Sequence, residues 1–300
     1  MSVFDKSYRR YKGELKGRWF KIWSIATTTF RVQFSGKKII FLLILCNIPM
    51  IAFTLMLVFT AIFFPQGLTE MLFGMFGTLD VAMYTVINFT FNAGLIFLPI
   101  VFISALNSGT IANDKKHNSL ALYMAKPIDR IDYVLGKTIS VYMISSFVTL
   151  IPWLMFLILF TLLAGSTQIQ FLDTLWVYLS TSGSALVVIL FLGSIVLLFS
   201  SFSNQSVLAG ILTIMILFLP DILVTTISGI LDISWINYLS ISTLLTAAIF
   251  LIFGKPDFEG LLGSFYEANI NGWISIVILL AIAIICVLFT INNLYKEEID

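Results

Sequence analysis

Long runs without a charged residue alternate along the chain with short charged stretches. The uncharged runs cover residues 39–69, 81–113, 138–172, 174–220, 233–254 and 268–295. About 20 apolar residues, at roughly 1.5 Å each in a helix, cross the ~30 Å hydrocarbon core of a membrane. Five of the six runs are long enough for a crossing, and the fourth is long enough for two.

This pattern predicts an all-α membrane protein with six spans. The spans are placed at residues 39–64, 86–106, 137–163, 174–199, 206–230 and 272–294. A polar cluster at residues 200–206 turns the chain between the fourth and fifth spans. The apolar segment at residues 238–253 is short for a full crossing and favours a re-entrant or interfacial helix within a long outer segment, residues 231–271. A full crossing there would place the C-terminus outside.

The composition agrees with a membrane protein and excludes a soluble enzyme. Apolar and aromatic residues make up 59% of the 300 residues and charged ones only 11%, against about 25% in a typical soluble domain. The net charge of +1 leaves no basic surface for nucleic acid. Cys46 and Cys286 both lie inside apolar runs, which favours packing over a disulfide or a metal site.

Lysine and arginine residues are concentrated in two segments on one side of the predicted membrane. Ten of the 17 precede residue 39 and five lie between the second and third spans, whereas the predicted outer loops are mainly acidic. Because cytoplasmic loops carry an excess of positive residues, we expect the N-terminal segment and this loop in the cytoplasm. Six spans also return the C-terminus to the cytoplasm.

Residues 1–37 are predicted to form a cytoplasmic segment with an amphipathic helix on the inner membrane surface, and residues 38–300 the transmembrane domain. The apolar stripe of this helix recurs at three- and four-residue steps and consists of Trp19, Ile22, Trp23, Ala26 and Phe30. Tryptophan favours the headgroup level, and basic side chains favour anionic lipid. We therefore expect Trp19, Trp23 and Phe30 at the membrane interface. The alternative is a solvated tail that only sets the topology.

The sequence contains no recognisable set of side chains for catalysis or metal binding. His117, the single histidine, lies in a charged loop, and a zinc, haem or Ser/His/Asp site needs further partners. Residues 136–138 resemble the end of a P-loop, but Ile131 stands where that motif requires glycine. Asp221 is the ionisable candidate inside a span; it lines a substrate path or simply reaches the interface. We predict no catalytic residue, cofactor or metal.

The loop between the second and third spans exposes large apolar side chains among charged ones. Asn118 or Ser119 can cap a helix there and Pro127 must end it, so the helix has about two turns. Its large apolar residues are Leu120, Leu122, Tyr123 and Met124. Each forgoes roughly 1.5–3 kcal/mol when left in water, which indicates a docking surface; packing on the protein's own inner face is the alternative. Pro127 would open the first turn of the next helix, with Asp129 and Asp132 near its positive end.

The same loop resembles that of the ABC-2 type permeases, the membrane subunits of ATP-binding-cassette exporters. In that family an acidic residue after the second span precedes an aliphatic-rich segment, a proline, an arginine and a "DYxLGK" sequence. The matching residues here are Asp114, Leu120, Leu122, Tyr123, Met124, Lys126, Pro127, Arg130 and residues 132–137. The likeness also covers the chain in outline, from the amphipathic N-terminal helix through six spans with a long outer segment before the last.

The resemblance implies that the chain is not an enzyme and that ATP hydrolysis belongs to two copies of a separate nucleotide-binding subunit. Residues 118–126, called the docking segment below, would be the coupling helix seated in that subunit. The family's elbow helix would lie at residues 19–30, and residues 202–205 would make a second, smaller contact. A second copy of this chain or a homologous permease would complete the unit.

The leading hypothesis is a permease subunit that couples ATP hydrolysis by its partner to the export of a substrate. The alternative is a membrane scaffold or mechanotransmitter that acts on an extracytoplasmic partner through residues 231–271 without transport. An ion-coupled secondary transporter would need a relay of buried charges and two matching halves, which the predicted spans lack.

Overall fold

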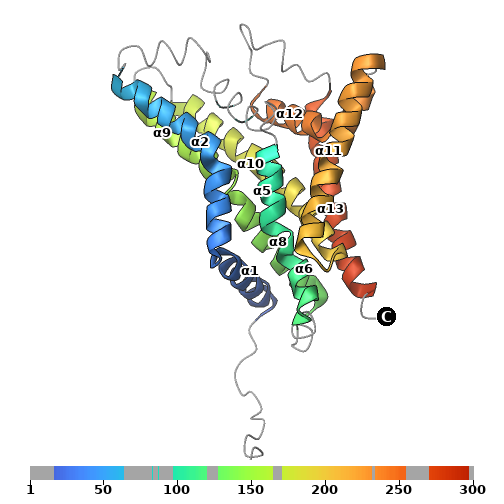
Figure 1. Cartoon of the computed structure of the whole chain (residues 1–300). Helices are drawn as coiled ribbons and strands as arrows, with labels where there is room; N and C mark the ends of the chain where they lie inside the picture. Colours follow the sequence, from blue (N-terminus) through green and yellow to red (C-terminus); the bar gives the residue numbers. More distant parts are fainter. Residues whose placement is uncertain are drawn as a thin grey trace, which may run out of the picture.

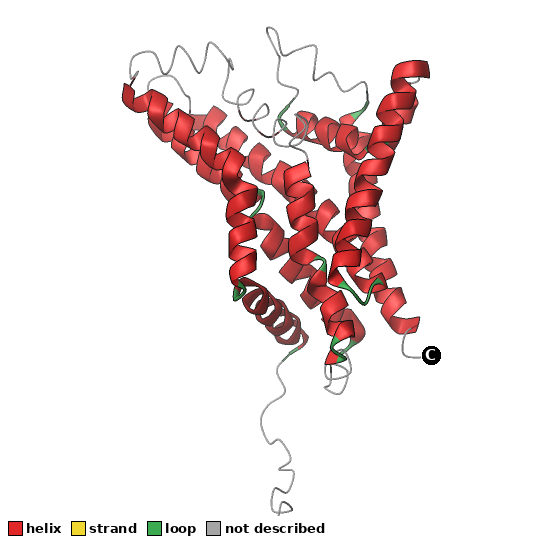
Figure 2. Ribbon diagram, viewed as in Figure 1, coloured by secondary structure: helices red, strands yellow, loops and turns green. Residues whose placement is uncertain are grey.

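The chain forms a helical bundle whose long helices run between two ends of the molecule (Figures 1 and 2). The computed structural model describes residues 17–63, 83, 87, 97–119, 128–164, 171–231, 234–254 and 270–296. Every regular element in these residues is a helix. The α-helices are α1 (Arg18–Phe34), α2 (Lys37–Phe63), α5 (Phe97–Asn107), α6 (Gly109–Lys116), α8 (Arg130–Ser146), α9 (Leu150–Ala164), α10 (Phe171–Phe202), α11 (Ser206–Leu231), α12 (Ile241–Ile252) and α13 (Gly272–Lys296), with a 3₁₀ helix η2 (Ser234–Leu239) before α12.

Within the described residues, four helical stretches are long and apolar enough to cross a membrane. They are Arg130–Leu162, Thr174–Phe202, Ser206–Ser228 and Gly272–Tyr295. A fifth is α2, if its two parts are counted as one span; these parts meet at an angle of 53° on either side of Pro49, a residue that interrupts helical hydrogen bonding. The predicted second span, residues 86–106, lies largely outside the described residues, and α5 accounts for its last part. Six spans therefore stay a prediction.

The third predicted span differs from the structure at its start and in its middle. It begins at Arg130, seven residues before Lys137, because Asp129 adopts an extended conformation that ends the preceding loop. The expectation that Pro127 opens this helix is therefore wrong. The span is also interrupted by a turn between α8 and α9. Pro152, near the start of α9, cannot donate the backbone hydrogen bond that a continuous helix would require.

The two ends of the bundle hold different helices. In Figure 1, α1, α6 and the C-terminal end of α13 lie at one end, called the α1 end below. At the other end, α12 lies across the bundle beside α11 and α13. With 12 residues, α12 is shorter than a span, in keeping with the expectation for residues 238–253. Gly254, with φ of +80°, ends it in the left-handed conformation that glycine adopts freely.

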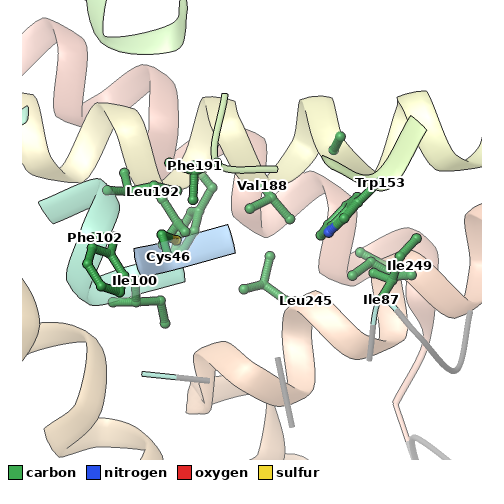
Figure 3. Close-up of a cluster of buried hydrophobic side chains, with 14 of the residues drawn as sticks. Cys46, Ile87, Ile100, Phe102, Trp153, Val188, Phe191, Leu192, Leu245 and Ile249 are labelled. Atoms are coloured by element: carbon green, nitrogen blue, oxygen red, sulfur yellow. The ribbon is translucent and has the colours of Figure 1, made fainter. Parts of the chain in front are cut away.

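The apolar core is built around α10, the most buried of the four candidate spans. Residues from α5, α9, α10 and α12 meet there (Figure 3). Labelled members include Phe102, Trp153, Val188, Phe191, Leu192, Leu245 and Ile249. Cys46 is a free, buried cysteine in this core, and Cys286 is another. Both cysteines therefore pack as small apolar side chains, as their place in the sequence predicts.

Candidate functional site

The docking segment is described only at its base. Most of the residues expected to form its outer surface lie outside the described residues, namely Leu120, Leu122, Tyr123, Met124, Lys126 and Pro127. The structure does describe the chain as it enters the segment, through α6 to Ser119, and as it leaves, from Ile128 into α8. The site is therefore defined by what holds these two flanks.

Asp114, near the end of α6, joins the first flank to α8. Its Oδ2 atom lies 2.6 Å from Lys137 Nζ and accepts a hydrogen bond of 2.7 Å from Tyr133 Oη. Tyr133 and Lys137 are four residues apart and so lie on one face of α8. The side chains of Lys137 and Asp114 are only 4% and 19% exposed, which makes this a largely buried ion pair. Asp114 was expected to contact a partner; the structure turns it toward α8.

The chain turns sharply between α6 and the docking segment. Asn118 has φ of +54°, a left-handed conformation that asparagine tolerates better than most residues, and its N–H donates to Lys115 O. Ser119 Oγ then donates to the backbone oxygen of Asp114 at 3.1 Å and lies 3.3 Å from its Oδ1. The first residues of the docking segment are thus fastened to the carboxylate that also holds α8.

The second flank is fastened to α1. Asp132, in the first turn of α8, is buried and lies 2.5 Å from Arg18 Nε. This hydrogen bond, with the attraction between the opposite charges, raises the pKa of the Arg18 guanidinium above its usual value. Gly136 allows the close contact between α1 and α8, since a β-carbon there would lie 2.8 Å from Ile25 and 3.0 Å from Ile22 O. From the sequence, Arg18 is expected only to add to the basic residues that set the orientation in the membrane.

Arg130, another residue expected to meet a partner, lies against α13. Its guanidinium carbon lies 4.5 Å from the centre of the Tyr295 ring, within the range of a cation–π interaction. The last turns of α13 therefore border the second flank. Nothing in the linear sequence pairs these residues, since they are far apart along the chain and lie on different helices.

The last turn of α10 supports α6 from the other side. Ser200 Oγ accepts hydrogen bonds from Ile111 N at 2.9 Å and Ala112 N at 3.0 Å, and donates to Ser108 O at 2.7 Å. A helix normally takes such a bond from a capping residue of its own. Here a side chain of α10 fills the role for α6, because Ser108 makes no capping bond through its side chain.

Ser201 links this turn to α6 and to α13. Its backbone oxygen accepts hydrogen bonds from Lys115 Nζ and from Asn293 Nδ2, the latter at 2.9 Å. Beside it, the end of α6, the turn after α10 and the start of α11 line a depression of about 430 Å³. The lining residues are Lys115, Lys116, Asn204, Gln205, Ser206 and Val207. The depression adjoins residues 202–205, where a second partner contact is expected.

The aromatic residues expected at the membrane interface take different positions on α1. Trp19 and Trp23 are exposed, whereas Ile22 and Ala26 from the same stripe are buried. The centre of the Phe30 ring lies 4.4 Å from that of Phe34, and both rings lie near Phe147. One part of the predicted stripe is therefore covered by protein, mainly by α8.

Asp221, in α11, holds the start of α12. Its Oδ1 atom accepts hydrogen bonds from Ser240 Oγ at 2.7 Å and from Ser242 N at 3.0 Å. A carboxylate at a helix N-terminus is favourable, because it accepts from free N–H groups and faces the positive end of the helix dipole. Among the described residues, no group of three or more histidine, cysteine or acidic side chains could hold a metal ion.

These features define a membrane protein of several apolar helices with a braced polar site at one end. Residues 23–298 match the family model described as ABC-2 family transporter protein. Since the match covers most of the chain, the protein belongs to the ABC-2 transporter family, as the membrane component of an ABC transporter. A search of curated proteins finds no match to the chain.

Proposed function

We propose that this chain is a permease subunit that couples ATP hydrolysis by a separate nucleotide-binding subunit to the export of a substrate. Its docking segment, residues 118–126, would sit in the ATPase, and movement there would shift the bundle between two arrangements of helices. Two ATPase copies and a second permease would complete the unit. The observation that carries the proposal is the polar bracing of both flanks of the docking segment in a chain of the ABC-2 family.

The bracing supports this function because a loop passes on a displacement only if its base resists deformation. Asp114 ties the entry of the loop to α8, and Asp132 ties its exit to α1. From there α8 continues into a membrane span. A loop that served only as a connection would not need two ion pairs at its base, since exposed loops are commonly mobile.

The distribution of basic residues supports a cytoplasmic position for the α1 end. Helices α1 and α6, and the first turns of α8 that are joined to them, carry Arg18, Lys21, Arg31, Lys115, Lys116, Arg130 and Lys137. An excess of lysine and arginine on one side of a membrane favours the cytoplasmic side. An ATPase that draws on cellular ATP must bind on this side, so orientation and function agree.

Co-purification of the ATPase tests the proposal. A tag on this chain should recover a vanadate-sensitive ATPase from membranes of its own host, and the Leu122→Asp/Tyr123→Asp variant should lose it while still inserting. Trp235→Asp is the matched control, because Trp235 is an exposed aromatic residue outside α1, α6 and α8. Equal ATPase recovery with the wild type and with the Leu122/Tyr123 variant would contradict the proposal.

A further inference from the structure

The ion pair between Asp114 and Lys137 has an environment unusual for a structural contact. Its two charges are largely removed from solvent. Burying two charges costs more free energy than burying apolar residues of similar size. Stability alone therefore gives a weak reason for such a pair. What a buried pair does supply is a fixed geometry, because its bonds are directional and cannot slide as apolar contacts can.

The hydrogen bonds of Asp114 are arranged to fix three pieces of chain at once. Oδ2 receives both Lys137 Nζ and Tyr133 Oη, from successive turns of α8. Oδ1 faces Ser119 Oγ, at the start of the docking segment. The Lys137 ammonium also lies 5.5 Å from the centre of the Tyr133 ring, so the two α8 side chains brace each other. One carboxylate thus joins α6, the docking segment and α8.

We infer that Asp114, Tyr133 and Lys137 form a clamp that passes displacement of the docking segment to α8. This inference rests on the proposed function and names positioning residues for it. Without the clamp, a displacement of the docking segment would separate α6 from α8 and would not move α8. With it, α6 and α8 move together, and α1 follows through Arg18 and Asp132.

The clamp differs from a partner-binding role for the same residues. Tyr133 is fully buried and the Lys137 side chain is almost so, which leaves neither available to an ATPase. Clamp variants should therefore still recover the ATPase, unlike a variant in which Leu122 and Tyr123 are changed. This separates loss of transmission from loss of docking.

The apolar triple variant Asp114→Leu/Tyr133→Phe/Lys137→Met removes the directional bonds and leaves no buried charge unpaired. Tyr133→Phe alone removes one bond, keeps the ion pair, and serves as a milder variant should the triple fold poorly. Arg31→Met is the matched control, because Arg31 is an exposed basic residue on α1 that belongs neither to the clamp nor to the depression beside α6. Each complex is purified through a tag on this chain, and its thermal midpoint is recorded.

Hydrogen–deuterium exchange with and without ATP and vanadate measures the transmission. In the wild type and Arg31→Met, nucleotide should change exchange in the docking segment and in α8 and α9. In the triple variant the docking segment should still respond, while the response of α8 and α9 falls about five-fold or more, the lower range of typical coupling between sites. Tyr133→Phe should fall between these results.

The outcomes separate the clamp from the proposed function. An unchanged nucleotide response of α8 and α9 in both Tyr133→Phe and a folded triple variant would overturn the clamp and leave the proposed function standing. A triple variant that loses the ATPase would assign these residues to docking and also overturn it. If the wild-type chain recovers no ATPase at all, the proposed function and the clamp both fail.

Discussion

Gly136 shows how a single hydrogen atom in place of a side chain sets the distance between two helices. A β-carbon at this position would come within 2.8 Å of Ile25, closer than packed carbon atoms lie. The contact explains why α1 can lie directly on α8 although α8 is otherwise rich in larger residues. It also makes the position a sensitive test of the packing.

Gly136→Ala should force α1 away from α8 and destabilise the protein by about 1–3 kcal/mol, the usual cost of overpacking. We expect a lower thermal midpoint in detergent and faster tryptic cleavage at Arg18 and Lys21. Gly183→Ala is the control, since a β-carbon there would meet only Ile252 at 3.5 Å, an ordinary contact. An equal effect of the two substitutions would show that α1 does not depend on the close approach.

Removing one partner of the buried ion pair should destabilise the protein more than replacing all three polar residues of the clamp with apolar ones. Lys137→Met leaves the Asp114 carboxylate without its counter-ion, and such a loss typically costs about 3–5 kcal/mol. The apolar triple variant at Asp114, Tyr133 and Lys137 should recover most of this, because it buries no unpaired charge. Thermal midpoints of the two variants give the comparison; a triple variant less stable than the single one would contradict it.

For individual residues, the sequence indicated which charged side chains matter but not which of them form ion pairs. Asp114 and Lys137 both belong to the motif that carries the family resemblance, yet their contact depends on how α6 returns beside α8. Arg18 and Asp132 are 114 positions apart, so local pattern cannot pair them. A signal was present in Lys137 itself, because a lysine at the start of a membrane span requires a partner.

Helix bounds could be predicted where polar clusters or charges flank an apolar run. The predicted fifth and sixth spans agree closely with α11 and α13, because a polar turn precedes the first and charged residues follow the second. Only the start of the third span was placed too late, because hydropathy alone cannot tell where a helix begins in a polar loop. There the backbone of Asp129, rather than Pro127, decides the start of α8.

The amphipathic pattern of α1 predicted an apolar face but not what covers it. Ile22 and Ala26 face α8, whereas Trp19 and Trp23 remain exposed. A periodic stripe reports only that some side chains avoid water. Lipid and protein can each cover an apolar face. The structure was therefore needed to show which side chains of α1 are covered by protein and which are exposed.

Cysteine labelling along α1 tests this division. In a background without Cys46 and Cys286, a label at Trp19→Cys should react and be quenched by a quencher attached to lipid headgroups, as expected for a residue at the membrane interface. Ile22→Cys should react more slowly by about ten-fold or more, because a buried thiol reacts only when the structure opens locally. Equal reactivity at both positions would contradict the packing of α1 on α8.

At the scale of the whole molecule, the arrangement of basic residues predicts a single orientation in the membrane. Lys116→Cys, at the α1 end, should be labelled by an impermeant reagent only in inside-out vesicles. Trp235→Cys, in η2, should be labelled only in right-side-out vesicles, if the spans alternate as predicted. Both residues are exposed in the structure, so protection would reflect the membrane rather than burial. The reverse pattern would place the docking segment away from cytoplasmic ATP.

Reconstitution of the whole complex distinguishes transport from a scaffold role. In proteoliposomes, a permease should move lipid or solute only with ATP, and the apolar triple variant should reduce this movement while the ATPase stays bound. A mechanotransmitter would hydrolyse ATP without moving either. ATP turnover without movement of a broad panel of lipids and solutes would therefore favour the scaffold reading of residues 231–271.

The dependence of α6 on Ser200 has a consequence for how the protein is made. The serine hydroxyl that completes α6 arrives with α10, some 90 positions later in synthesis. In a nascent chain that has inserted only its first spans, the α6 helix before the docking segment therefore still lacks the hydrogen bonds that Ser200 provides. We expect the chain to bind the ATPase only after α10 has entered the membrane. An incomplete subunit would then not stimulate ATP hydrolysis.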